Sequence, residues 1–521
     1  MEEEYSVDPA QLLSAATEFA NDPGAASDVS VKEFLDRFPL PAIINALQTR
    51  GDYPGLVDVL VDSLERVFRT KYGASLIPHY MPFIVVGLGA DSQRIRYLAC
   101  KTVSCLLENN DDTVAVHLIS QYGVYPLLLD CLVQGDERVA TASAEAIRNL
   151  AVSPKGLVIM FPSDSSEATN LEILAGKCSS MGRVRVLALI VKLFSVSSSV
   201  ASVVYSSKLL GLLEKEVSNS GDTLVTLTVL ELLYELAEVQ HSTEFLSKTT
   251  IIQLLCAIIS DASADSVLRS RAMMITGRLL SKENVFMFLD NSSFEAVISA
   301  ISRRFDFLGS QDADECECAL EALGHIGSSN QGATLLFSSS PPAARHVIDA
   351  AFDRQQRNKQ LAALHSLANI VGEARNDIIL TGDAEETLRR LIYEAASRTS
   401  KVLPSGLLLS VLQQDFEIRL AGYRLITGLV ARPWCLMEII LKPEIIQIVT
   451  DTLTETQKIG MEARHNCCQA VFKSLTSSPN LVSDPAFAGV AAKLQEAIRR
   501  GPYLAKTRTE AQPAVMTAER F

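Results

Sequence analysis

Apolar residues recur along this chain in one helical pattern that returns about every 42–46 residues, a spacing typical of HEAT and armadillo repeats. Each copy opens with a polar turn and continues as a stripe rich in Ala, Leu and Val. The paired positions that mark the copies are Val103/Leu106, Ile147/Leu150, Val191/Phe194, Leu233/Leu236, Thr276/Leu279, Leu323/Ile326, Leu367/Ile370, Ile426/Leu429 and Val471/Leu475. One repeat cannot bury such a stripe alone, so its neighbours must cover it. The sequence therefore predicts an all-α, HEAT/armadillo-type right-handed helical solenoid.

Breaks in the pattern predict five segments along the chain. The distance from Leu367 to Ile426 is 59 residues where one period would be about 44. The extra length contains Pro404 and Gly406, which we place in a loop. The predicted segments are an N-terminal irregular helical cap (1–90), regular repeats (91–374), an inserted helix and loop (375–412), C-terminal repeats (413–500) and a disordered tail (501–521).

Composition agrees with a solenoid and narrows the class of partner. The chain has 521 residues, of which 48% are hydrophobic but only 6% aromatic, so its core must be built from aliphatic side chains. A solenoid can bury a chain of this length as one array because its core grows along one axis. The net charge is −14, which argues against nucleic acid as the main partner. An acidic chain fits a basic protein partner, but charge alone favours an ordinary acidic soluble protein.

The N-terminus and the absence of long apolar runs predict a location in the cytoplasm, with the nucleus left open. Met1-Glu2-Glu3-Glu4 is acidic where a secretory signal would be basic. No apolar run reaches the length that spans a membrane. The ten cysteines are scattered, and none forms a C-x-x-C pair. We therefore expect reduced thiols and no membrane partner.

The search for catalytic and metal-binding motifs predicts neither an enzyme nor a cofactor. No phosphate-binding loop, H-E-x-x-H or G-x-S-x-G motif is present. Cys316 and Cys318 with His325 are the best metal candidates, but helix positions two apart point in different directions. The acidic run from Asp312 to Glu321 is better explained as a helix start, where carboxylates suit the helix dipole.

One polar position recurs just before the core residue of each repeat's last helix and is the candidate binding site. Armadillo proteins place this helix on the concave face, where such side chains contact a ligand. The candidate partner-binding residues are Asn149, Glu235, Arg278, His325 and Asn369, with Gly428 and Ser474 at the equivalent positions further on. The alternative is that any one of them is only a solvated helix position.

Short motifs near the C-terminus carry a family resemblance. Gln414-Asp415-Phe416 precedes a repeat helix, Pro433-Trp434 follows it, and Gly501-Pro502-Tyr503 stands near the C-terminus. In this order they resemble the 26S proteasome non-ATPase regulatory subunit 5 family, most clearly over 410–506. The resemblance implies an all-helical chaperone that holds the C-terminal domain of one ATPase subunit while the proteasome base assembles. It implies no catalytic residue.

From the repeats and the resemblance together we expect a proteasome assembly chaperone. It would bind the C-terminal domain of a base ATPase subunit on a concave solenoid surface and block premature docking on the core particle. The alternative is a generic armadillo-type adaptor for cargo or signalling proteins. An import-receptor groove is a poor fit, because the single Trp434 cannot supply a ladder of tryptophans. We expect the free chain to be a monomer.

Overall fold

The computed structural model describes residues 8–49, 53–162, 170–219, 222–307, 313–375, 379–380, 382–478, 481 and 485–503. Within these ranges every regular element is a helix and no strand occurs. The chain divides into two compact units, unit 1 (Met1–Leu254) and unit 2 (Leu255–Phe521), each described by itself. The division falls inside α18 (Ile251–Ser260).

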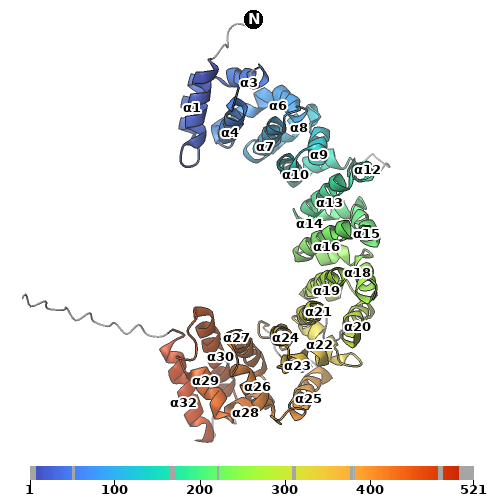
Figure 1. The fold of residues 1–521 in the computed structure, drawn as a ribbon, viewed down its shortest axis with the longest axis vertical. Helices are drawn as coiled ribbons and strands as arrows, with labels where there is room; N and C mark the ends of the chain where they lie inside the picture. The colour runs from blue at the N-terminus through green and yellow to red at the C-terminus, as the bar shows by residue number, and fades with distance from the viewer. Residues whose placement is uncertain are drawn as a thin grey trace, which may run out of the picture. The chain divides into compact units, whose positions relative to one another are not determined.

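A row of helices runs through each unit, and each helix of the row packs on the next. In unit 1 these row helices are α1 (Pro9–Asn21), α4 (Leu56–Phe68), α7 (Gln93–Asn109), α10 (Glu137–Val152), α13 (Ser180–Phe194) and α16 (Thr223–Glu238). In unit 2 they are α19 (Ser266–Leu280), α21 (Ala313–Ile326), α24 (Arg357–Ile370), α27 (Phe416–Leu429), α30 (Lys458–Thr476) and α32 (Pro485–Arg500). Figure 1 shows the row along one side of each unit.

The remaining helices are shorter on average, and many of them pack against the row helices. In unit 1 they are α2 (Asp28–Arg37), α3 (Leu40–Thr49), α5 (Lys71–Leu76), the 3-10 helix η1 (Ile77–Tyr80), α6 (Met81–Leu88), α8 (Asp112–Gln121), α9 (Val124–Gln134), α11 (Pro154–Met160), α12 (Asn170–Lys177), α14 (Ser198–Ser206), α15 (Leu210–Ser218) and α17 (Ser242–Leu246). In unit 2 they are the 3-10 helix η2 (Glu283–Met287), α20 (Asn291–Phe307), α22 (Asn330–Ser338), α23 (Ala344–Ala351), α25 (Asp383–Ser397), α26 (Pro404–Leu412), α28 (Pro433–Ile440) and α29 (Pro443–Thr450).

The polar turns of the sequence pattern are the caps of these helices. Five row helices follow an aspartate whose carboxylate accepts a hydrogen bond from a backbone N–H of the first turn: Asp8, Asp136, Asp222, Asp265 and Asp415. Each bond satisfies a donor that has no partner inside the helix, and losing such a cap costs about 0.5–2 kcal/mol. Helices α11, α26, α28 and α29 begin at a proline, whose missing N–H is not needed in the first turn.

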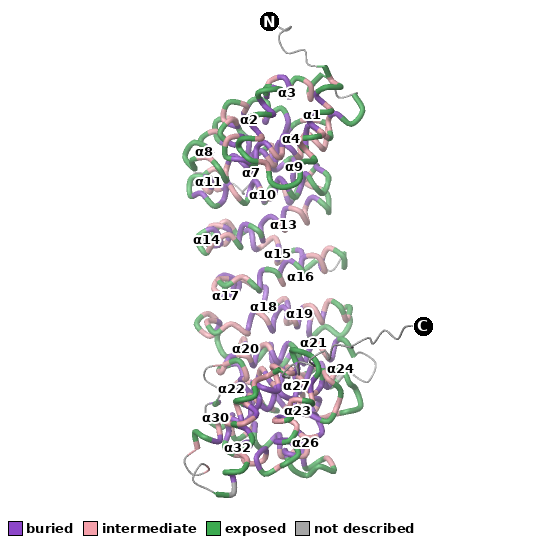
Figure 2. Tube along the Cα trace, turned by 90° about the vertical axis from the view of Figure 1, so that its left-hand side faces the viewer, coloured by how far each residue is buried: buried purple, intermediate pink, exposed green. Residues whose placement is uncertain are grey.

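The apolar stripe of the sequence pattern forms the core between the row helices. Every residue of the marker pairs is buried, and Leu323 and Leu367 have no exposed surface. Figure 2 shows that single helices carry both buried and exposed residues, as an amphipathic helix does when neighbours cover one side. The predicted all-α, HEAT/armadillo-type solenoid is confirmed in each unit.

The predicted insertion, residues 375–412, differs from the expected helix and loop. It contains two helices, α25 and α26; Pro404 is the first residue of α26, and Gly406 lies inside that helix. Glu438 on α28 joins the two helices. Its carboxylate accepts a hydrogen bond from the hydroxyl of Tyr393 on α25 (3.0 Å) and another from a backbone N–H in the first turn of α26 (3.3 Å). The other segment boundaries stay predictions, and residues 504–521 of the predicted tail lie outside the described residues.

A charge cluster is buried where α19, α20 and α21 meet. Glu315, from the acidic run, has no exposed surface. Arg269 of α19 donates to its carboxylate at 2.9 and 2.7 Å, and Arg304 of α20 donates at 2.9 Å. Both guanidinium groups are themselves buried. The described part of the run begins in the first turn of α21, as a helix start requires, and Asp312 lies outside the described residues. The Glu315 carboxylate also joins α21 to α19 and α20.

Among the described helices, none is by itself long and apolar enough to cross a membrane. Helices α8 and α9 would pass that test only as a pair, and the pair bends by 76° at its break.

Truncating the core between row helices should destabilise the fold. We expect Leu323→Ala or Leu367→Ala to lower the free energy of unfolding by about 2–5 kcal/mol, because each leaves a cavity. Leu453, which is 72% exposed, provides the control. Leu453→Ala should change the free energy by about 0.5 kcal/mol or less in the same urea titration. Equal losses for the buried and exposed leucines would contradict the core assignment.

Removing the charge of Glu315 should cost stability in a pH-dependent way. Burial disfavours its ionised form, but the hydrogen bonds and charges of Arg269 and Arg304 outweigh burial and lower its pKa from 4.5. The ionised carboxylate therefore stabilises the fold fully above pH 4.5, and this contribution fades as the pH falls through the lowered pKa. At pH 7 we expect Glu315→Gln to cost about 3–5 kcal/mol, because it leaves two buried cations without their anion.

Glu317 on the same helix is the matched control. Burial, Asp314 and Glu321 raise its pKa, so its ionised form opposes folding. Glu317→Gln should be neutral or slightly stabilising at pH 7. Urea titrations at pH 7 and pH 4 should show that the loss caused by Glu315→Gln shrinks at the lower pH. A loss independent of pH would contradict the ionic role of Glu315.

Candidate protein-binding surface

The five predicted contact residues lie on five different row helices. In unit 1, Asn149 lies on α10 and Glu235 on α16, and α13 comes between these helices in the row. In unit 2, Arg278, His325 and Asn369 lie on the successive helices α19, α21 and α24. Glu235 is exposed and the other four are half-buried. Only the three residues of unit 2 therefore come from consecutive row helices.

The equivalent position on α27 does not continue the polar series. Gly428 is buried, and a Cβ atom there would lie 2.6 Å from the side chain of Val371. The chain that follows α24 packs directly on this part of α27, so the interpretation of Gly428 as a groove position was wrong. Ser474 on α30 is half-buried.

Arg278 and His325 lie close enough for the charge of one to affect the ionisation of the other. Burial lowers the pKa of His325, and the positive charge of Arg278 lowers it further. Burial raises the pKa of Glu321, one turn before His325, while Arg278 opposes that rise. A neutral imidazole can both donate and accept a hydrogen bond, whereas the guanidinium only donates. Together these side chains offer a partner donors and acceptors on two adjacent helices.

Asn369 belongs to a network centred on Arg424 of α27, which the sequence analysis did not identify. The guanidinium of Arg424 donates to Asn369 Oδ1 (3.2 Å), to the Glu373 carboxylate (2.8 and 3.0 Å) and to His365 Nδ1 (2.8 Å). Because arginine has no acceptor, His365 Nδ1 must accept. Burial and then the charge of Arg424 lower the pKa of His365. A partner that reaches Asn369 would therefore meet a pre-arranged group of four polar side chains.

In unit 1 the row carries an open polar groove of about 640 Å³ between side chains of α4, α7 and α10. Lys101 pairs with Glu145 at 2.6 Å, and Arg94 bridges to two aspartates of α4 at 2.9 and 3.0 Å. Beyond the groove, Asn149 donates to Glu108 at 2.7 Å. Partly exposed pairs of this kind each contribute about 0–1 kcal/mol, so a partner can exchange them for its own charges at small cost.

Two of the missed ion pairs carry a signal that the sequence does contain. Lys101 and Glu145 are 44 residues apart, and Arg269 and Glu315 are 46 apart. Each distance is one repeat period, because partners on neighbouring row helices occupy nearly equivalent positions. A search for opposite charges one period apart would have found both pairs.

The cysteines and acidic residues of the described ranges do not form a metal site. No three His, Cys, Asp or Glu side chains are grouped there in a way that could hold an ion. Cys316 is buried and Cys318 half-buried on α21, in line with their expected different directions. Burial raises the pKa of Cys318, and it raises that of Cys256 to about 11. At neutral pH these two thiols are protonated and poor nucleophiles.

Comparison with known proteins gives one family over most of the chain. The family model described as Proteasome non-ATPase 26S subunit matches residues 42–519. Proteins named 26S proteasome non-ATPase regulatory subunit 5 are 22% identical over 453 residues in Bos taurus and 21% identical over 455 residues in Homo sapiens. Both alignments cover 86% of this chain and 85% of the relative.

Solved structures show weaker likeness. An engineered protein aligns with a TM-score of 0.43 and 15% identity over 89% of this chain and 99% of its own. A designed armadillo repeat protein aligns with a TM-score of 0.36 and 15% identity over 50% of this chain and 98% of its own. The fold assignment therefore rests on the stacked rows themselves.

Proposed function

The chain belongs to the proteasome non-ATPase 26S subunit family, and we propose that it is an assembly chaperone for the base of the regulatory particle. The observation that carries the proposal is the family match over residues 42–519, which includes most of both units. The proposed partner is the C-terminal domain of one base ATPase subunit. The chain would act without catalysis, as a monomer in the cytoplasm, by holding this subunit and sterically blocking its docking on the core particle.

The row helices supply a surface suited to this task. The polar network around Arg424 in unit 2 and the polar groove of unit 1 offer hydrogen-bond groups whose positions are set before a partner arrives. Pre-arranged groups lower the entropy that binding must overcome. The net charge of −14 favours encounter with a basic face of the partner. We propose Asn149, Glu235, Arg278, His325 and Asn369 as contact residues.

The proposal is tested by measuring binding of the full chain to the separately purified C-terminal domain of each base ATPase subunit. We expect one of these domains to form a one-to-one complex by calorimetry. We also expect the chain to be scarce in fully assembled 26S particles and present with free base subunits. Binding to none of the domains, or stoichiometric presence in mature particles, would show that the chain is not an assembly chaperone.

Alanine at Glu235, Arg278, His325 and Asn369 together should weaken that complex while the protein stays folded. The exposed Glu235 should contribute about 0.5 kcal/mol or less to stability and each half-buried position about 0.5–3 kcal/mol, whereas a binding hot spot contributes more than about 1 kcal/mol to affinity. The control is Glu295→Ala with Arg303→Ala, two exposed positions on α20 away from the row. We expect the control to bind like the wild type. A folded fourfold variant with unchanged affinity would remove the row from the contact surface.

A further inference from the structure

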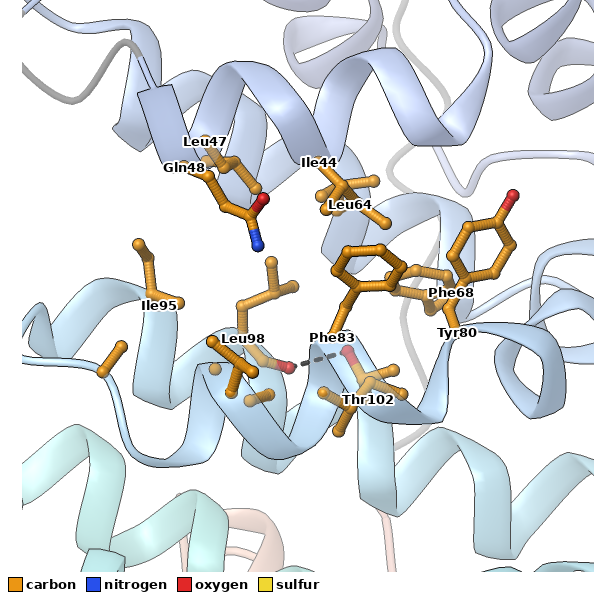
Figure 3. Close-up of a pocket in the computed structure, with 15 residues that line it drawn as sticks. Ile44, Leu47, Gln48, Leu64, Phe68, Tyr80, Phe83, Ile95, Leu98 and Thr102 are labelled. Carbon is orange, nitrogen blue, oxygen red and sulfur yellow. Dashed lines mark hydrogen bonds between the residues drawn. The ribbon is translucent and has the colours of Figure 1, made fainter. Parts of the chain in front are cut away.

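Unit 1 contains a second groove, apolar in character, that shares no residue with the polar groove. It lies between α3 and α4 on one side and α6 and α7 on the other (Figure 3), and its volume is about 290 Å³. Its walls include Ile44, Leu47, Phe68, Phe83, Ile95 and Leu98. Thr102 also borders the groove, but its hydroxyl already donates to the carbonyl of Leu98 at 2.7 Å (Figure 3). The groove therefore offers mainly apolar surface.

Two of the four helices around this groove, α3 and α6, carry no charged side chain. This holds for all ten residues of α3 and all eight of α6. Phe83 on α6 is nevertheless 44% exposed, and Val86 is 62% exposed. A surface helix ordinarily turns charged residues outward, and contiguous exposed apolar residues mark binding sites in soluble proteins. The uncharged walls require an uncharged, apolar contact face on whatever binds.

The volume of the groove favours a short inserted segment over a second copy of the chain. A cavity of about 150 Å³ holds one benzene ring, so about 290 Å³ accommodates about two apolar side chains. A stable complex of two protein copies buries about 1,200–2,000 Å² in total, far more than two side chains supply. A short segment that inserts two anchor residues fits this volume.

The position of the groove favours a helical segment. Outside the row, α6 packs directly on α9 of the next repeat. The groove lies at the other flank of α6, between it and α3, where another helix could pack in the same way. Helices that dock in such grooves present anchor side chains at i and i+3 or i+4.

We propose that this groove is a docking site for an amphipathic helix of a partner protein, which inserts two apolar side chains spaced three or four residues apart. The site contains none of the candidate contact residues and none of the residues of the polar groove, and it does not depend on the chaperone proposal. The contact is apolar, so its affinity should be nearly insensitive to salt, unlike binding at the row.

The test uses a displayed library of 16-residue alanine-rich helical peptides, with one face randomised, selected against the full chain. We expect enriched peptides to carry Leu, Phe or Met at i and i+3 or i+4. Their affinity is then measured by fluorescence anisotropy for the wild type and two groove variants, Val86→Lys and Ala90→Trp. The first places a charge at the groove, and the second fills it with an indole ring. Each should weaken binding at least tenfold.

The matched control is Val158→Lys. Val158 is 60% exposed in the last turn of the short helix α11, as Val86 is 62% exposed in the last turn of α6. We expect this control to bind the peptides like the wild type, and circular dichroism should show all variants equally helical. Enriched peptides that lack the apolar pair, or that bind Val86→Lys and Ala90→Trp as tightly as the control, would overturn the proposal. A dimer of the free chain that these two variants abolish would assign the groove to a second copy and also overturn it.

Discussion

The whole array depends on a burial requirement that no single repeat can meet. Each interior row helix has an apolar stripe that must be covered by the row helices before and after it. Burying one leucine of that stripe contributes about 1.5–3 kcal/mol to the free energy of folding. A row helix is therefore stable only when it is packed against its neighbours. Helix α1 heads the row in unit 1 and α32 ends it in unit 2, and each of these packs on one row neighbour. Polar side chains therefore occupy the face of each row helix that no neighbouring helix covers, where they can contact a partner protein.

The sequence predicted the parts of the fold that local chemistry determines. Aliphatic spacing located the stripe, and the polar turns before it contain helix caps such as Asp136 and Asp415, whose carboxylates satisfy backbone donors. The second helix of the insertion was missed because Pro404 and Gly406 were assigned to a loop, whereas Pro404 is the first residue of α26 and Gly406 lies inside it. Glu315 was assigned to a helix start, since nothing beside it in sequence reveals the two arginines that it meets in the core.

The candidate surface was predicted in outline but not in detail. The recurring polar position did place residues on successive row helices of unit 2. Sequence could not show that Asn369 is held by Arg424, or that the same position on α27 is closed by Val371. These contacts depend on how closely the helices of two neighbouring repeats approach each other. That distance is set by the volumes of the side chains in both repeats.

The polar bonds that join neighbouring repeats have a consequence for how such a chain can change in evolution. Lys101 and Glu145, Arg269 and Glu315, and Tyr393 and Glu438 are each separated by about one period, so every member is matched to the repeat beside it. Duplication or loss of an interior repeat would bring unmatched side chains together at the new junction, with a buried carboxylate such as Glu315 left without its cations. The buried pair of Arg269 and Glu315 therefore opposes the exchange of its two repeats more strongly than the apolar stripe alone would.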